Sequence, residues 1–520
     1  MAFKIARKPK KPKAANWVPI PKKIKWAIVG LFVGMFLGAL DQSVLGAALP
    51  TIVGELNGVE HMLWVTTAYA LAATVVLPIS GKMGDLFGHK QLFVVSILVF
   101  IAGSAVCISA HTMTALIVGR AIQGFGGGGL MVLAQTILAK MLPDLDQLKR
   151  VTPYFAIIFG GSFIVGPFIG GFFTSIDWRL VFWLNVPVGG LALFAALKLV
   201  PKISDRLEKP KIDYAGIVLL SLASVAIVLA TSWGGTQYAW TSPVIVLLLV
   251  GAVLCGVTFA FVERDAAQPI IPWSLFRNRN FVVTTAALTV FGVVMMGALA
   301  YLPTYLQMVS GASATKSGLF LMPMVFGMFI TGMFVMVIER RTKRYKWAPL
   351  TGMVVIAISL GLMNTMTPAT SVGVIMVYVG LLGLGMGLSM QILMLVIRNE
   401  YQGDEFAVAT AGNRYFQQMG MTFGAAAIGA LFVANLQHQL TQRLPGMPVG
   451  AGGRGSLTPD MVAALPPGVR SAVIESYNYA LTPIFIYIIP LVVVAFGILW
   501  RLQENPIRSN INDYGGMPGM

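Results

Sequence analysis

Two side chains of opposite charge lie inside long apolar stretches of the sequence. Asp41 follows Trp26 by about 15 residues, which is about 22 Å along a helix. Arg120 follows Thr112 by about eight residues, or about 12 Å. If the two stretches cross a membrane in opposite directions, both charges reach the same half of it at similar depth. They could then form an ion pair or share an aqueous cavity. An ionisable group inside a span is unfavourable and is therefore a candidate for function.

The pair has the chemistry of a proton carrier. Burial favours the neutral form of a carboxyl group, and a nearby cation favours the charged form. A carboxyl group balanced between these two effects can bind and release a proton as a cavity opens to either side. The alternative for Asp41 and Arg120 is a static ion pair that fixes helix packing.

Further polar residues in apolar stretches are candidates for lining a cavity. Gln123 lies one helical turn after Arg120, and Arg414 is followed closely by Gln418. The alternative for Arg414 is a side chain that snorkels to the inner membrane face.

Recognisable machinery for other chemistry is missing from the sequence. It contains no GxxxxGK[ST], HExxH, CxxC or GxSxG motif. We therefore expect no enzyme activity, no metal and no cofactor. The energy is expected to come from an ion gradient, a proton gradient above all, or else from the solute's own gradient. A membrane-embedded enzyme and a passive channel are the competing classes.

The elements that must position these residues are membrane-spanning helices. The 520 residues are 57% apolar and 11% charged, whereas soluble domains average about 25% charged residues. Spanning the hydrocarbon core takes about 20 mostly apolar residues. Fourteen stretches qualify, and they do not alternate as barrel strands do: 25–50, 62–81, 91–110, 112–139, 151–174, 180–198, 213–233, 243–262, 281–306, 317–338, 347–364, 371–397, 405–434 and 478–500.

The basic residues set the orientation. The formal net charge is +17, and Lys and Arg gather in the arm 1–24 and in every second connection. The opposite connections hold only a few, at Arg179, Lys316, Arg443, Arg454 and Arg470. By the positive-inside rule, both termini are cytoplasmic, in a multi-pass protein of the inner (cytoplasmic) membrane. The basic arm fits contact with anionic lipids rather than nucleic acid. The Gly- and Pro-rich segment 435–477 is expected to be a weakly structured outer loop.

A weak internal repeat predicts the domain organisation. Leu49-Pro50-Thr51 closes the first span, and Leu302-Pro303-Thr304 closes the ninth. An offset of eight spans fits two six-helix bundles with two helices inserted between them. The predicted units are the arm 1–24, the bundle 25–200, the inserted helices 201–265, the bundle 266–500 with its loop 435–477, and the tail 501–520.

Four segments resemble the signatures of a transporter family. They read LDQSVLGAALPTI from Leu40, GKMGDLFGHK from Gly81, LIVGRAIQGFGGG from Leu116 and SFIVGPFIGG from Ser162. In this order they resemble the major facilitator superfamily, and in particular its fourteen-helix drug:proton antiporter branch, the EmrB/QacA family. The third segment matches most closely.

The resemblance implies an all-α major facilitator fold and proton-driven export by alternating access. It implies that Asp41 is the proton site and Arg120 its partner. It further implies an inner gate, formed by Gly81, Asp85, Gly88 and Lys90. It also implies an antiporter motif on the fifth span, formed by Gly166, Pro167, Gly170 and Gly171. The alternative for Asp85 and Lys90 is a solvated loop pair, and for the glycines ordinary small-residue packing.

The substrate class is inferred from the absence of a second deep acid. No carboxylate lies deep in the tenth span, which favours neutral, amphipathic or monocationic solutes, with anions admitted through Arg414. We therefore expect an exporter of lipophilic or cationic toxic compounds. The alternative is a dedicated exporter of a lipid, fatty acid or secondary metabolite. The expected partners are small amphipathic substrates, protons and membrane lipids, and the expected state is a monomer.

Overall fold

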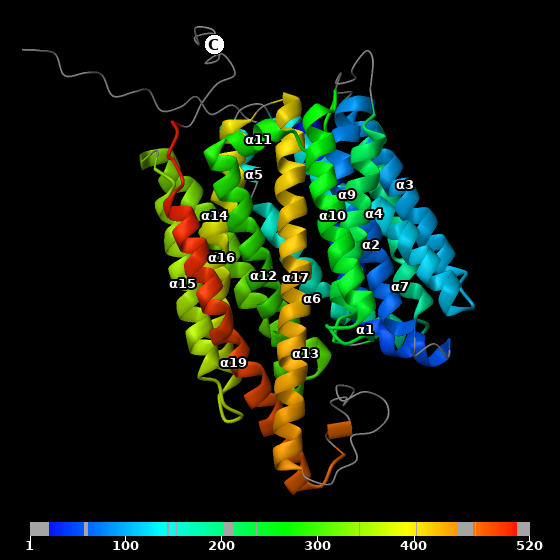
Figure 1. The fold of residues 1–520 in the computed structure, drawn as a ribbon, viewed down its shortest axis with the longest axis vertical. Coiled ribbons are helices and arrows are strands. Elements are labelled where there is room, and N and C mark those ends of the chain that lie inside the picture. The colour runs from blue at the N-terminus through cyan, green and yellow to red at the C-terminus, as the bar shows by residue number, and fades with distance from the viewer. Residues whose placement is uncertain are drawn as a thin grey trace, which may run out of the picture.

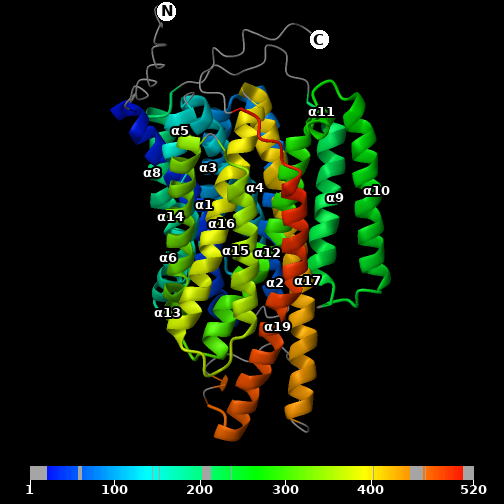
Figure 2. The same ribbon diagram turned by 90° about the vertical axis from the view of Figure 1, so that its left-hand side faces the viewer.

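The computed structural model describes residues 20–56, 61–142, 145–151, 153–201, 212–235, 237–342, 344–401, 403–444, 461–462 and 464–506. These residues form a bundle of long helices (Figures 1 and 2). The helices are α1 (Lys22–Glu55), α2 (Met62–Phe87), α3 (His89–Ile108), α4 (Met113–Met141), α5 (Leu145–Val151), α6 (Tyr154–Thr174), α7 (Arg179–Trp183), α8 (Asn185–Lys198), α9 (Tyr214–Trp233), α10 (Pro243–Asp265), α11 (Trp273–Arg277), α12 (Arg279–Met308), α13 (Ala314–Phe320), α14 (Met322–Thr342), α15 (Trp347–Asn364), α16 (Val372–Glu400), α17 (Gly403–Arg443) and α19 (Pro467–Trp500).

The long helices confirm the predicted spans. Thirteen helical segments of the described chain are long and apolar enough to cross a membrane. The fifth predicted span, 151–174, is occupied by α6, an apolar helix of 21 residues. Large apolar side chains cover the outside of the bundle; on α10, for example, Leu247 is 74% exposed and Phe261 is 66% exposed. An apolar outer surface of this extent is matched by lipid, and the chain is a multi-pass membrane protein.

Two groups of helices pack mainly among themselves. In the first, α1 packs on α6, and α4 packs on α2 and α3. In the second, α12 packs on α17, and α16 packs on α14 and α15. Helices α9 and α10 pack on each other, and α9 also contacts α2 and α17. Figure 2 shows this pair beside α17 at the edge of the bundle.

We call the end of the bundle where α1 begins and α19 ends the proximal end, and the opposite end the distal end (Figure 2). Glycines allow the helices of the first group to approach closely between these ends. A Cβ atom at Gly128 of α4 would lie 2.5 Å from the Ala73 carbonyl oxygen of α2. Small residues at such contacts are typical of helix packing in membranes, where van der Waals contact drives association.

The connection between α2 and α3 is shorter than predicted. The sequence predicts that the span ends at 81 and that a loop follows, but α2 continues to Phe87 and α3 starts at His89. Gly88 alone joins them, with φ of 94°, a conformation that glycine adopts without steric penalty. Gly81 and Asp85 therefore lie in the last turns of a helix.

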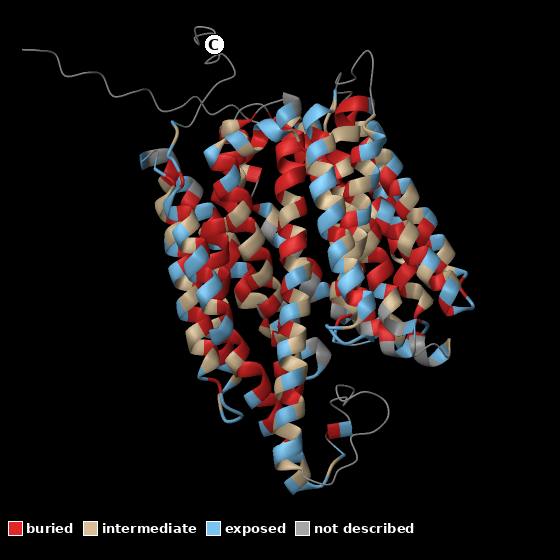
Figure 3. Ribbon diagram, in the orientation of Figure 1, coloured by how far each residue is buried: buried red, intermediate tan, exposed pale blue. Residues whose placement is uncertain are grey.

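The segment 435–477 is also more helical than predicted. Helix α17 continues to Arg443, and α19 already begins at Pro467, so the expectation of a weakly structured loop is wrong at both ends. Residues 435–443 contain no Gly or Pro, and a proline is well tolerated in the first helical turn. In Figure 3, α17 is buried toward the proximal end and exposed toward the distal end, which fits an extension into water. The Pro- and Gly-rich residues 445–460 lie outside the described residues.

Candidate functional site

A closed polar network surrounds Asp41 in the first group of helices. Arg120 of α4 donates from Nη1 to Asp41 Oδ2 at 2.5 Å, and both side chains are almost fully buried. Asn185 of α8 donates from Nδ2 to Asp41 Oδ1 at 2.8 Å. Gln123 donates from Nε2 to the same oxygen at 3.4 Å. Two other helices, α4 and α8, thus supply three donors to one carboxylate.

Arg120 has several partners besides this carboxylate. Its Nη1 lies 2.8 Å from Gln123 Oε1, and its Nε lies 3.4 Å from the carbonyl oxygen of Val65. Its guanidinium stacks on the Tyr69 ring, with 4.5 Å between Cζ and the ring centroid. A buried charge needs this kind of compensation, and these contacts would remain if Asp41 became neutral.

Ser104 of α3 closes the network on its far side. Its Oγ accepts a 2.7 Å hydrogen bond from Gln123 Nε2 and a 3.3 Å bond from Asn185 Nδ2. Ser104 in turn donates to the carbonyl oxygen of Phe100 at 3.0 Å. Fully satisfied networks of this kind hold their members in fixed positions.

The antiporter-motif residues lie on α6 against α1. Ser43, two residues after Asp41, donates to the carbonyl oxygen of Ser162 at 2.7 Å. A Cβ atom at Gly166 would overlap Ser43 Oγ, so the glycine permits this close contact. A Cβ at Gly171 would meet open space instead, and Gly170 is buried. Pro167 lies within the bounds of α6.

The predicted inner-gate residues gather at the proximal ends of α2 and α3. Asp85 is buried, and its Oδ1 lies 3.3 Å from Nε2 of His89. His89 is fully buried and its Nδ1 lies 3.5 Å from Lys140 Nζ of α4. Lys90 donates to the carbonyl oxygens of Leu197 and Val200 at 3.0 and 2.6 Å. The reading of Asp85 as part of a solvated loop pair is wrong, because α2 extends past it and buries it.

The two helix groups touch each other at the proximal end. Arg398 of α16 donates from Nη2 to the carbonyl oxygens of Ala139 and Leu142, each at 3.1 Å. These carbonyls belong to the last turn and C-cap of α4, where backbone acceptors lack helical partners. A Cβ at Gly81 of α2 would lie 2.6 Å from the Ala411 Cβ of α17, so these helices also meet closely.

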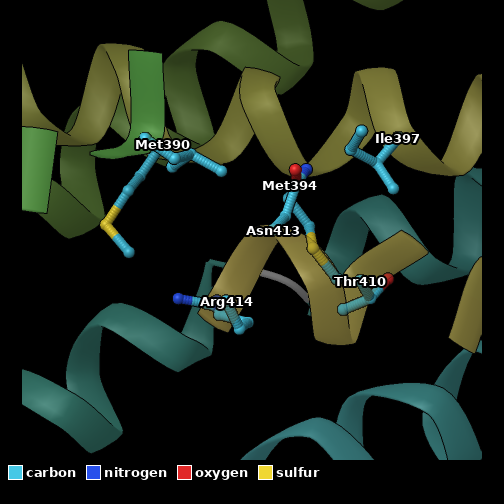
Figure 4. A pocket seen from close by; sticks show the side chains of 7 residues that line it. Met390, Met394, Ile397, Thr410, Asn413 and Arg414 are labelled. Carbon is cyan, nitrogen blue, oxygen red and sulfur yellow. The ribbon is translucent and has the colours of Figure 1, made fainter. Parts of the chain in front are cut away.

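A second polar position lies in the other helix group. Leu288, Met390, Met394, Ile397, Thr410, Asn413 and Arg414 line a hollow between α12, α16 and α17 (Figure 4). Arg414 is half-buried and donates from Nη1 to Gln417 Oε1 at 2.9 Å. Gln418 is half-buried one turn further on and does not line this hollow. Gln123, predicted as a cavity residue, belongs to the Asp41 network instead.

Sequence reasoning missed three members of the site. Asn185, Ser104 and Tyr69 all contact the ionic pair or its partners, and each is at most 3% exposed. Asn185 carries a signal that could have been used, since an amide inside an apolar span needs a polar partner there. Ser104 and Tyr69 carry no such signal, because both residue types are common in spans and only packing shows which ones face the charge.

Comparison with known proteins yields a family and a fold. Residues 31–425 match the family model described as Major Facilitator Superfamily. The chain is 38% identical over 486 residues to an uncharacterized MFS-type transporter of Mycobacterium tuberculosis, covering 93% of this chain and 70% of the relative. It is 36% identical over 424 residues to the multidrug transporter protein MdtP of Bacillus subtilis, covering 80% of this chain and 77% of the relative.

A solved structure has the same arrangement of helices. The crystal structure of the human organic anion transporter MFSD10 (TETRAN) superposes with a TM-score of 0.59 at 12% sequence identity. The match covers 92% of this chain and all of the other chain. At this identity the similarity concerns the fold alone.

Proposed function

The chain belongs to the major facilitator superfamily, and from this we propose that it is a proton-coupled exporter of lipophilic or cationic toxic compounds. Its similarity to a protein named as a multidrug transporter supports export of foreign compounds. The observation that carries the proton coupling is the position of Asp41, a buried carboxylate that accepts hydrogen bonds from three side chains on two other helices, α4 and α8.

In the proposed cycle, Asp41 exchanges its proton as the cavity changes sides. In the present structure every hydrogen bond described for Asp41 is one that it accepts, and the side chain pairs with Arg120. A charged carboxylate behaves in this way. Protonation would remove the charge and weaken the link between α1 and α4. Arg120 would keep Gln123, Val65 and Tyr69 as partners, so the neutral state of Asp41 is accessible without leaving the arginine unsupported.

The proposal also includes an orientation. The proximal end carries the described basic residues Lys22, Lys23 and Lys25 at the start of α1. By the positive-inside rule this end faces the cytoplasm, in a protein of the cytoplasmic membrane. We further propose that the protein works as a monomer and without a bound cofactor. In this orientation the contacts of Arg398 with α4 would lie on the cytoplasmic side.

The test measures proton movement driven by a solute. Proteoliposomes hold a pH-sensitive dye, and ethidium is added as the cationic probe. We expect proton movement with the parent and at least a tenfold lower rate with Asp41→Asn, while the exposed Asp177→Asn serves as the matched control. An unchanged rate in Asp41→Asn would overturn the assignment of the proton site.

A second variant separates coupling from folding. Removing one partner of a buried ion pair destabilises a protein by about 3–5 kcal/mol, because the other charge is left uncompensated. The double variant Asp41→Asn/Arg120→Gln removes both charges and should recover much of this stability. If it recovers stability and also restores proton movement, the pair is a static packing element and Asp41 carries no proton.

A further inference from the structure

We propose that Asp213 and Glu263 share one proton, so that helices α9 and α10 carry a proton-binding site separate from Asp41. Asp213 is the N-cap residue of α9, and Glu263 lies in the last turn of α10. Helix α9 begins and α10 ends at the proximal end, where α11 also lies (Figure 2). The contacts that define the site do not depend on the proposed transport function; only its assignment to the cytoplasmic side rests on the proposed orientation.

Each of the two acids uses one carboxyl oxygen to bind a backbone amide. Asp213 Oδ1 accepts a 2.8 Å hydrogen bond from the amide of Gly216 in the first turn of α9. Glu263 Oε1 accepts a 2.6 Å hydrogen bond from the amide of Ile271, in the connection between α10 and α11. These bonds fix the orientation of both carboxyl groups and leave one oxygen of each for another partner.

The two remaining oxygens lie beside the same point. A Cβ atom at Gly216 would overlap Asp213 Oδ2 and would lie 2.8 Å from Glu263 Oε2. The two side chains are within hydrogen-bonding reach of each other, yet among the described residues neither oxygen has a donor, and Glu263 is 3% exposed. Two charged carboxylates repel each other, whereas a carboxyl group and a carboxylate form one strong hydrogen bond. A single shared proton therefore satisfies both oxygens.

The surroundings of the pair supply no cation. Within the described residues neither acid forms an ion pair, and the charged group with the largest effect on Glu263 is Asp213. Other titratable groups at the proximal ends of the neighbouring helices are exposed, half-buried or engaged elsewhere: Tyr214 on α9, Arg264 and Asp265 on α10, Arg277 on α11, Lys82 and Asp85 on α2, and Glu405 on α17. We assign the proton to Glu263, because the N-terminus of α9 favours the charged form of Asp213.

Glu263 holds the connection that leads from α10 to the second helix group. In this connection Ile270 and Ile271 are 3% and 4% exposed, and they belong to one apolar cluster with Ala139 of α4 and Phe406 of α17. The cluster lies where the two helix groups touch, since the carbonyl oxygen of Ala139 also accepts a hydrogen bond from Arg398. The protonated pair therefore keeps the connection packed into the proximal contact between the groups.

Loss of the shared proton should release this connection. The proton passes to a water molecule or a buffer base at the proximal end, and two like charges are left facing each other. The repulsion is relieved when Glu263 turns toward water, which also removes the acceptor of the Ile271 amide. A rise in pH on the proximal side is thus expected to loosen the contact between the helix groups.

Infrared spectroscopy tests whether the proton is present and shared. The full-length protein in lipid nanodiscs is measured at neutral pH, and the carbonyl-stretching band of a protonated carboxyl group is followed. Glu263→Gln should lack one such band that the parent shows, and the exposed Asp265→Asn should retain it. Asp213→Asn should reduce the same band at least fivefold, because the amide NH2 group would donate to Glu263 Oε2 and stabilise its charged form.

Hydrogen exchange tests whether the pair holds the connection. Exchange of peptides that contain Ile271 is measured by mass spectrometry between about pH 6 and about pH 9 and corrected for its intrinsic pH dependence. The corrected rate should rise at least tenfold with pH in the parent. In Glu263→Gln it should change by less than about twofold, because the glutamine oxygen still accepts from Ile271 and its NH2 group donates to Asp213.

The outcomes separate this site from the proton site at Asp41. If Glu263→Gln loses no carboxyl band, or Asp213→Asn keeps the band at full strength, the shared proton is refuted. Asp213→Asn supplies this decision even if Glu263→Gln does not fold. An equal pH dependence of exchange in the parent and in Glu263→Gln would refute the hold on the connection. Asp41→Asn should leave the Glu263 band and the exchange unchanged, so failure of the proposed transport function leaves this test intact.

Discussion

Replacement of Arg398 by glutamine tests how strongly the proximal ends of α4 and α16 are held together. Arg398 donates two hydrogen bonds at 3.1 Å to carbonyl oxygens of Ala139 and Leu142 at the end of α4. The positive charge also lies at the negative end of the α4 dipole. These contacts join one helix group to the other, so they exist only while the proximal ends of α4 and α16 are together.

The expected magnitude follows from these two bonds. A hydrogen bond to a charged group contributes about 1.5–3 kcal/mol when its partners stay dry. Arg398 is half-buried, and the α4 carbonyls regain water when the ends separate, so the two bonds together contribute about 1–3 kcal/mol. Their loss shifts the equilibrium between closed and open proximal ends by a factor of about 5–150.

The assay measures the distance between the two groups at this end. Spin labels are attached to cysteines introduced at Gln91 and Gln503, both exposed, after alanine has replaced the two native cysteines. Double electron–electron resonance should show a larger long-distance population in Arg398→Gln than in the parent. The exposed Arg470→Gln variant controls for a change in net charge. The reasoning fails if Arg398→Gln leaves the distances unchanged, or if Arg470→Gln produces an equal shift.

Two glycine substitutions test close helix contacts. In Gly166→Ala the new methyl group overlaps Ser43 Oγ, so we expect the free energy of unfolding to fall by about 1–3 kcal/mol, measured as a lower melting temperature. In Gly171→Ala the methyl group meets open space, and the free energy of unfolding should change by no more than about 0.5 kcal/mol. Equal melting temperatures for these two variants would contradict the packing argument. In Gly81→Ala the new methyl group lies 2.6 Å from Ala411 Cβ, and we expect weaker contact of α2 with α17 and more open proximal ends by the same resonance measurement. Adding Ala411→Gly should restore the distances measured in the parent. If the distances in the double variant differ from the parent as much as those in Gly81→Ala do, another contact holds these helices together.

The spans could be predicted from the sequence because their signal is local. About 20 consecutive apolar residues are required by the thickness of the bilayer, whatever the rest of the chain does. Helix ends were predicted less well, since they depend on single residues. Helix α2 continues to Phe87 and ends there because Gly88 follows. Helix α17 continues beyond its apolar segment to Arg443 because its polar extension keeps good helix formers.

The sequence by itself also determined that Asp41 and Arg120 lie at similar depth, because depth follows from counting residues along a helix. Only the tertiary structure decided that the two side chains meet at 2.5 Å, and that Asn185 and Ser104 complete the network. Which side of a helix faces which neighbour depends on contacts between residues far apart in the chain, up to 144 positions for Asn185 and Asp41. For the same reason the different surroundings of Arg120 and Arg414, one paired with a carboxylate and the other beside a hollow, follow from packing and not from composition.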